Sequence, residues 1–179
     1  FYTFGSARYL TPSSYFKLMD LASGFPHDQI IIVSNTDRYG GGGVYNMFAS
    51  CTGGHAYSGA VLTHEFGHSF GGLGDEYSDP DITYDAVGGR NVEPASPNLT
   101  TLVDFDSKWA DMVYDTVPVP TPETDEYVSV VGAFEGGGYA SEGIYRPAMR
   151  CHMHSLDAAF CPVCQSLLED MLQFYCDMD

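Results

Sequence analysis

Two histidines and three acids lie within HEFGHSFGGLGDEY, residues 64–77. His64 and His68 are four residues apart, so on a helix both imidazoles leave one face about one turn apart and can reach the same zinc ion. Glu65 then lies beside that ion, where a carboxylate can take a proton from an activated water and deliver it to a departing amine. This HExxH spacing predicts a metal site with Glu65 as its general base.

The glycines of the same stretch indicate how a third ligand could be supplied. Gly71 and Gly72 are expected to end the helix and to allow a sharp reversal of the chain. After that reversal, the carboxylate of Asp75 or of Glu76 could return to the same ion. Three protein ligands would leave one coordination position open for water, as a catalytic zinc site requires.

The extended motif HExxHxxGxxH marks the metzincin superfamily of zinc peptidases, and this sequence resembles it through His64, Glu65, His68 and Gly71. The sequence departs from the motif at Gly74, which stands where the third histidine is expected, and an acid follows it. We expect Asp75 to be the third ligand, because a shorter side chain one position later could reach a similar place. Glu76 is the competing candidate.

A longer pattern resembles the IgA-peptidase family of bacterial metallopeptidases, which belongs among the metzincin-like enzymes. Its parts are YGGGG, HEFGHSFGGLGDEY, PVPTP, EGGGYASEGIYRP, CHM and FCPVC, in this order, between about Asp28 and Cys164. Members of that family are zinc endopeptidases that bacteria typically export. The resemblance implies a secreted or cell-surface zinc endopeptidase that acts on a protein or peptide substrate, without implying that IgA is the substrate.

The metzincin resemblance also implies a Met-turn, a tight turn that carries a methionine beneath the metal-binding histidines. Met153 in RCHMHS is the expected residue, and Met149 is the alternative. Stabilisers of the developing oxyanion are suggested only by residue type, as Tyr77, Tyr139 and Tyr145.

Hydrophobic periodicity predicts the elements that position these residues. An amphipathic helix is expected to begin at Pro12 and to end near Gly24. Residues 30–34, IIIVS, form a continuous β-branched run typical of a central strand covered on both faces. Residues 58–71 are expected to form the helix that carries the HExxH motif, and residues 161–176 a closing helix.

The remaining segments are glycine-rich or irregular. Four glycines at 40–43 form either a loose connection or a sheet edge whose bare backbone pairs with an extended peptide. Residues 78–130 are rich in Pro, Asp, Asn and Gly, which favours irregular surface structure. With the resemblance, these elements predict an α/β (α+β) fold: a metzincin-like catalytic domain with a twisted, mostly parallel sheet, an active-site helix and a C-terminal helix. We expect residues 1–179 to be one domain and a piece of a longer chain.

The composition excludes several classes of partner. The chain has 7 Lys and Arg against 24 Asp and Glu, a net charge of −17, so a nucleic acid or an anionic membrane surface would be repelled. The hydrophobic content of 44% argues against a disordered acidic tail. The sequence contains no run of about 18 apolar residues that could span a membrane.

Five cysteines leave their pairing open. An acidic, cysteine-containing chain suits an exported protein, so one or two disulfides with a leftover thiol are expected. The competing hypothesis is a second, structural zinc site built from four of Cys151, His152, His154, Cys161 and Cys164. Free thiols are the third alternative.

A competing function from another class is a catalytically inactive surface module that binds protein or glycan and retains the peptidase fold. The intact Glu65 favours the enzyme, because a binding module needs no general base. The sequence does not indicate the oligomeric state.

Overall fold

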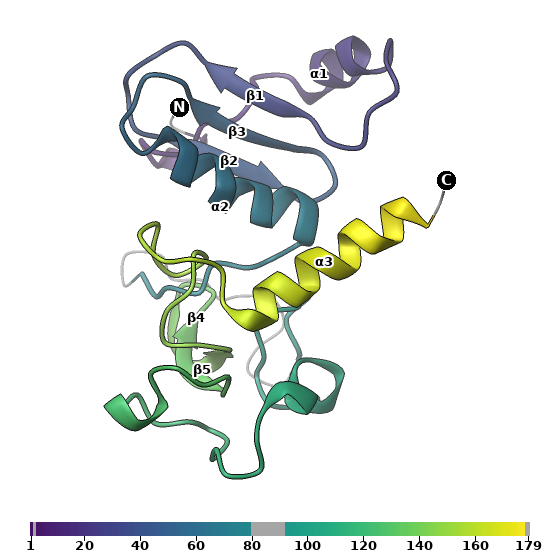
Figure 1. Ribbon diagram of the computed structural model, residues 1–179. Coiled ribbons are helices and arrows are strands. Elements are labelled where there is room, and N and C mark those ends of the chain that lie inside the picture. Colours follow the sequence, from purple (N-terminus) through teal and green to yellow (C-terminus); the bar gives the residue numbers. More distant parts are fainter. Residues whose placement is uncertain (2, 80–91, 178–179) are drawn as a thin grey trace. The chain divides into compact units, whose positions relative to one another are not determined.

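The computed structural model describes residues 1, 3–79 and 92–177, and the chain forms two compact units, Phe1–Gly72 and Leu73–Asp179 (Figure 1). Both units combine helices with strands, so the α/β class is confirmed in this broad sense. One catalytic domain over the whole chain remains a prediction. Within the described ranges, no helix has the length and apolar character needed to cross a bilayer.

The first unit is a three-stranded sheet with a long helix on one face (Figure 1). Its elements are η1 (Thr3–Gly5), α1 (Tyr15–Ala22), β1 (Ile31–Ser34), β2 (Gly41–Val44), β3 (Phe48–Thr52) and α2 (Ser58–Gly71). The strand order is β1-β3-β2, with β1 parallel and β2 antiparallel to β3. The prediction of a mostly parallel sheet is therefore wrong, because the chain turns back between Val44 and Phe48 and makes β2 and β3 a hairpin.

The prediction that residues 30–34 form a central strand is also wrong. β1 lies at one end of the three-stranded order, and Ile31 and Val33 are 52% and 59% exposed. All five residues of β3 are buried, so β3 is the central strand. A short β-branched run shows that a segment is extended, but it does not show which strands will lie beside it.

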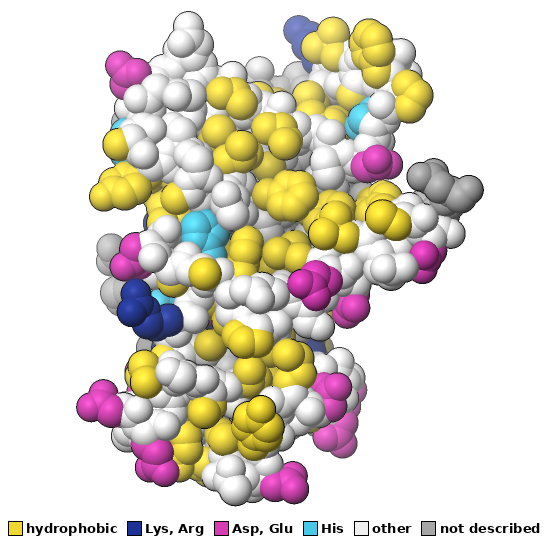
Figure 2. Space-filling model, in the orientation of Figure 1, with side chains coloured by type: hydrophobic (Ala, Val, Ile, Leu, Met, Phe, Trp, Pro, Cys, Tyr) yellow, Lys and Arg dark blue, Asp and Glu magenta, His cyan; other side chains and the backbone are white. Residues whose placement is uncertain are grey.

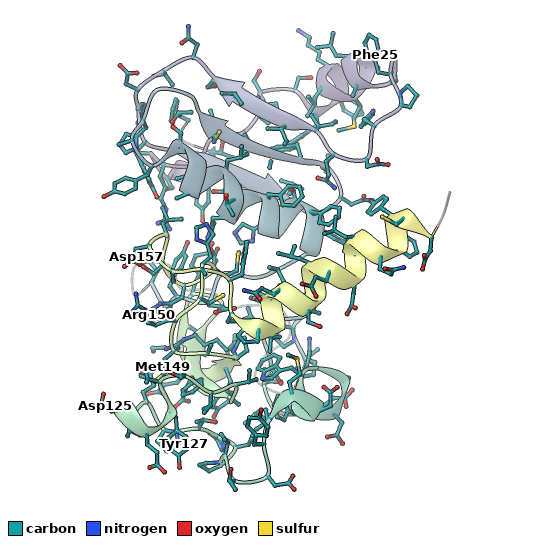
Figure 3. The ribbon with its side chains drawn as sticks, viewed as in Figure 1. Phe25, Asp125, Tyr127, Met149, Arg150 and Asp157 are labelled. Atoms are coloured by element: carbon teal, nitrogen blue, oxygen red, sulfur yellow. The ribbon has the colours of Figure 1, made fainter. Side chains whose placement is uncertain are left out.

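Helix α1 starts later than predicted and buries none of its residues. Its first residue is Tyr15, and the Ser14 side chain caps it by accepting a hydrogen bond from the Lys17 backbone N–H. Phe16 and Phe25 are largely exposed. Hydrophobic side chains gather over this helix in Figure 2, and Figure 3 shows Phe25 at its far end.

The glycine strand β2 lies at the other end of the sheet, as an edge strand should, but its outer edge is partly paired. The Gly41 backbone N–H donates to the Arg8 carbonyl, and the Leu10 N–H donates to the Gly41 carbonyl. An extended peptide therefore cannot pair with β2 at Gly41, because the backbone of Arg8 and Leu10 already does so.

Close packing of β2 against α2 explains why this strand contains glycines. A β-carbon at Gly43 would lie 2.4 Å from the Glu65 carbonyl oxygen and 2.8 Å from the His68 β-carbon. A β-carbon at Gly41 would lie 2.5 Å from the Val61 side chain. Only glycine allows the strand to approach the helix this closely.

Replacing Gly43 by alanine is expected to destabilise the first unit by about 1–3 kcal/mol, because the new methyl group must displace the α2 backbone. The matched control is Gly59→Ala in α2, where a β-carbon meets nothing within 4 Å. That control should stabilise the helix by about 0.5–1 kcal/mol. The measurement is denaturant-induced unfolding of both variants, and equal midpoints would contradict the packing argument.

The second unit contains a small sheet and the last helix. Its elements are η2 (Phe105–Ser107), η3 (Ala110–Met112), η4 (Asp125–Tyr127), β4 (Phe134–Gly137), β5 (Ala140–Arg146) and α3 (Pro162–Cys176). β4 and β5 are antiparallel, with Phe134 opposite Arg146. The closing helix is confirmed, and Cys161 is its N-cap.

The core of this unit gathers around Trp109. This side chain is 2% exposed and donates its indole N–H to the Gly132 carbonyl at 2.7 Å. Leu73, Met153 and Val163 belong to the same buried cluster. Residues 78–130 were predicted to be irregular. Their described part contains only short 3-10 helices and isolated bridges. Residues 80–91 lie outside the described residues.

Candidate metal centre

Helix α2 brings the two predicted histidine ligands together. The Nε2 atoms of His64 and His68 are 3.2 Å apart, and the two rings meet edge to face at 87°. Two nitrogens bound tetrahedrally to zinc at about 2.0–2.1 Å would be about 3.3 Å apart. The pair therefore has the separation that one zinc ion requires.

Glu65 lies on the same helix, and its carboxylate reaches the glycine strand. A β-carbon at Gly41 would lie 2.9 Å from Glu65 Oε1, so the missing side chain leaves room for the carboxylate. Burial raises the pKa of the neighbouring Cys51 thiol, and the Glu65 charge raises it further. The carboxylate thus lies beside β2 and close enough to Cys51 to act on its charge.

Gly72 ends α2 in a left-handed conformation with φ of 63°. Its backbone N–H donates to the His68 carbonyl, which closes the last turn. A residue with a β-carbon would be strained at this φ. The break that the sequence predicts at Gly71 and Gly72 is confirmed, and the second unit begins at the next residue, Leu73.

Asp75 is 7% exposed and is fixed within the second unit. The Tyr139 hydroxyl donates a hydrogen bond to Asp75 Oδ2. The Asp75 carbonyl accepts from the Gly138 N–H at 2.7 Å, and the ring of Tyr77 packs edge to face on that of Tyr139. Tyr139, one of the three tyrosines selected by residue type, therefore orients the predicted third ligand.

The structure explains why no histidine occupies position 74. A β-carbon at Gly74 would lie 2.6 Å from Leu99 Cδ1 and 2.9 Å from Ser96. Asn98 holds this backbone from both sides: its Oδ1 accepts from the Gly74 N–H at 2.6 Å, and its Nδ2 donates to the Gly74 carbonyl at 3.0 Å. The position that carries the third ligand in HExxHxxGxxH has no space for a side chain here.

Glu76, the competing third ligand, is directed into the second unit. It is fully buried, and its Oε1 accepts from Asn98 Nδ2 at 2.9 Å and from the Cys164 thiol at 3.1 Å. Burial raises the pKa of Glu76, and the charge of Cys151 adds to this rise. Asn98 thus binds the residues on both sides of Asp75, a role that no motif in the sequence indicates.

Replacing Asn98 by alanine should destabilise the second unit and loosen the backbone around Asp75. Each buried polar group left unpaired at Gly74 and Glu76 is expected to cost about 1–3 kcal/mol. The measurement is the free energy of unfolding, with Gln173→Ala as control, because that amide bonds Asp177 on the exposed face of α3. Equal losses in the two variants would contradict this role of Asn98.

The predicted disulfides find no support in the structure, where all five cysteines are free. Cys151, Cys161 and Cys164 gather at Glu76 instead. Hydrogen bonds with the thiols of Cys151 and Cys164 lower the pKa of Cys161 to about 5. His152 is not part of this group, and its Nδ1 lies 2.9 Å from the Ala158 carbonyl.

Met153 lies in a turn over residues 152–154 and is fully buried. Its carbonyl accepts a hydrogen bond from the Glu76 N–H at 2.8 Å. The alternative, Met149, is only partly buried and is labelled in Figure 3. Met153 is therefore the better candidate for the Met-turn, whose role beneath the histidines remains a prediction.

Comparison with known families decides the class of protein. The family model described as IgA Peptidase M64 matches residues 1–129 and 123–172. The chain belongs to the M64 family of IgA peptidases. The resemblance to the IgA-peptidase family is confirmed, and membership of a peptidase family implies a protein or peptide substrate. No curated protein matches the chain.

Proposed function

We propose that this M64 chain is a zinc-dependent endopeptidase in which His64, His68 and Asp75 hold the ion. The observation that carries the proposal is the 3.2 Å separation of the two imidazole Nε2 atoms on α2. Nitrogen and carboxylate oxygen are ligands that zinc accepts, and three of them leave a position for water or substrate.

The choice of Asp75 rests on the residues that follow the end of α2. Gly74 has no side chain and no space for one, and Glu76 is bound by Asn98 and Cys164. Asp75 is three residues beyond Gly72, which limits its α-carbon to about 11 Å from that glycine. Its Oδ2 is oriented by Tyr139, and its carboxylate is buried as a metal ligand should be.

His64, His68 and Asp75 would hold the zinc, which would supply a Lewis acid for the scissile carbonyl and would lower the pKa of a water to about 7. The Glu65 carboxylate accepts a proton from the attacking water and donates it to the nitrogen of the departing amine. The imidazoles of His64 and His68 would bind the ion, and the Tyr139 hydroxyl orients Asp75 through its hydrogen bond. The inactive binding module is the less favoured function, because it gives no reason for a carboxylate at position 65.

Removal of the metal tests the proposed function. Dialysis against a strong chelator should reduce cleavage of denatured casein to background, and stoichiometric zinc should restore it, because the histidine pair suits zinc and not a hard cation. Magnesium and calcium are the controls and should restore nothing. A metal-loaded chain that cleaves no protein, or a metal-free chain that cleaves as well as before, would contradict the proposal.

A further inference from the structure

A second group of metal-binding side chains lies wholly within the second unit. It consists of Glu76, Cys151, Cys161 and Cys164, all buried, with ligand atoms within 4.8 Å of one another. We propose that this group binds a structural zinc ion, through three cysteine sulfurs and one carboxylate oxygen. The proposal does not depend on the peptidase mechanism, because none of the four residues takes part in it.

The distances within the group fit a zinc ion better than a disulfide. The sulfurs of Cys151 and Cys164 are 3.6 Å apart. Two sulfurs bound tetrahedrally to zinc at about 2.3 Å would be about 3.8 Å apart, whereas a disulfide requires about 2.05 Å. The sulfur of Cys164 lies 3.1 Å from Glu76 Oε1, so the carboxylate belongs to the same cluster.

Glu76 supplies an independent observation that points to a cation. The residue is fully buried, and its Oε2 atom has no hydrogen-bond partner. A carboxylate in an apolar core is strongly unfavourable unless a positive group compensates it. The three cysteines of the group belong to a buried hydrophobic cluster with Leu73, Trp109 and Val163, which offer no charge. A zinc ion between Glu76 and the sulfurs would compensate both the carboxylate and the thiolates.

The backbone already presents the cysteines in the manner of a zinc site. Cys161 is the N-cap of α3 and Cys164 follows within the first turn, a CxxC spacing that directs both sulfurs to one point. The Cys161 N–H lies 3.4 Å from the Cys151 sulfur and donates to it. The positive end of the α3 dipole stabilises negative sulfur at this position.

The ion would join three segments that are distant in the sequence. Glu76 and Cys164 are 88 residues apart. The turn that follows Cys151 carries Met153, whose carbonyl accepts from the Glu76 N–H. The ion would therefore fix the backbone immediately after Asp75 to α3 and to the Met153 turn.

The test is a count and identification of the metals in the full chain purified under reducing conditions. Elemental analysis is expected to give two zinc ions per chain, and X-ray absorption at the zinc edge should show sulfur as well as nitrogen or oxygen neighbours. Cys164→Ser should lose one zinc together with the sulfur signal. Cys176→Ser, at an exposed cysteine on α3, should retain both ions.

Two further variants separate this proposal from the proposed function. His68→Ala should lose the histidine-bound ion and retain the sulfur-bound one. Glu76→Gln should weaken the sulfur-bound zinc by at least about tenfold in competition with a chelator, since a neutral amide replaces the charged ligand. If Cys164→Ser does not fold, the cobalt-substituted His68→Ala protein decides the question, because sulfur-to-cobalt charge-transfer absorption requires thiolate ligands.

Three results would overturn the second zinc site. They are a wild-type chain without sulfur neighbours at the metal, a single zinc that His68→Ala removes, and a Cys151–Cys164 disulfide detected by mass spectrometry in the freshly purified chain. A sulfur-bound zinc in a chain whose His64 and His68 bind nothing would support the second site and overturn the proposed function.

Discussion

Replacing Glu65 by glutamine is expected to reduce peptide-bond cleavage by about 100- to 10,000-fold, the range for losing a general acid and base. The side chain keeps its size, so the contact above Gly41 should remain. The amide is too weakly basic to accept the proton of the attacking water, and its N–H protons are too weakly acidic to be transferred to the amine. The loss should therefore fall on kcat, while KM and the zinc content remain close to those of the wild type.

The matched control for this variant is Glu169→Gln, an exposed acid on α3 that should leave cleavage unchanged. Both variants change the net charge equally, so a general effect of charge on substrate binding would appear in both. Cleavage by Glu65→Gln within about threefold of the wild type would assign the base to another residue. A loss of zinc in the same variant would indicate a structural role for Glu65.

Local spacing was sufficient to predict the helix that carries His64 and His68. Their separation of four residues places both rings on one face, and the glycines at 71 and 72 end the helix where the sequence indicates. These features depend on neighbours within one or two turns. A single sequence contains that information directly.

The errors concern features that depend on residues far away in the chain. Whether β1 is central depends on which strands pair with it, and the IIIVS run does not specify its partners. The glycines of β2 were interpreted as a loose connection or a substrate-binding edge, but Gly43 is required by the approach of α2. Packing between distant segments, rather than local propensity, determines both features.

The proposed second metal site was only partly predictable from the sequence for the same reason. The cysteines at 151, 161 and 164 were recognised as possible ligands, but the expected partners were His152 and His154, which are close in sequence. The fourth member is Glu76, which the fold brings to the sulfurs. Asn98 was missed for the same reason, because it contacts Gly74 and Glu76 across more than twenty residues.

Replacing Asp75 by asparagine should release the histidine-bound zinc and reduce cleavage by at least about 100-fold, since even residues that only orient a ligand contribute 10- to 100-fold to metal affinity. Asparagine has nearly the same shape, and its oxygen can still accept from the Tyr139 hydroxyl. What it lacks is the negative charge that binds a divalent ion. The stability of the chain without metal should therefore change little.

Tyr139→Phe is the matched variant, because it leaves the Asp75 carboxylate intact and removes only the hydroxyl that orients it. Zinc affinity should fall by about 10- to 100-fold, less than for Asp75→Asn, and excess zinc should restore cleavage. Chelator competition measures the affinity, and casein cleavage at saturating zinc measures the activity. If Asp75→Asn binds zinc as tightly as the wild type, the third ligand is another residue. If Tyr139→Phe loses cleavage at saturating zinc with its affinity unchanged, the hydroxyl acts on the substrate and not through Asp75.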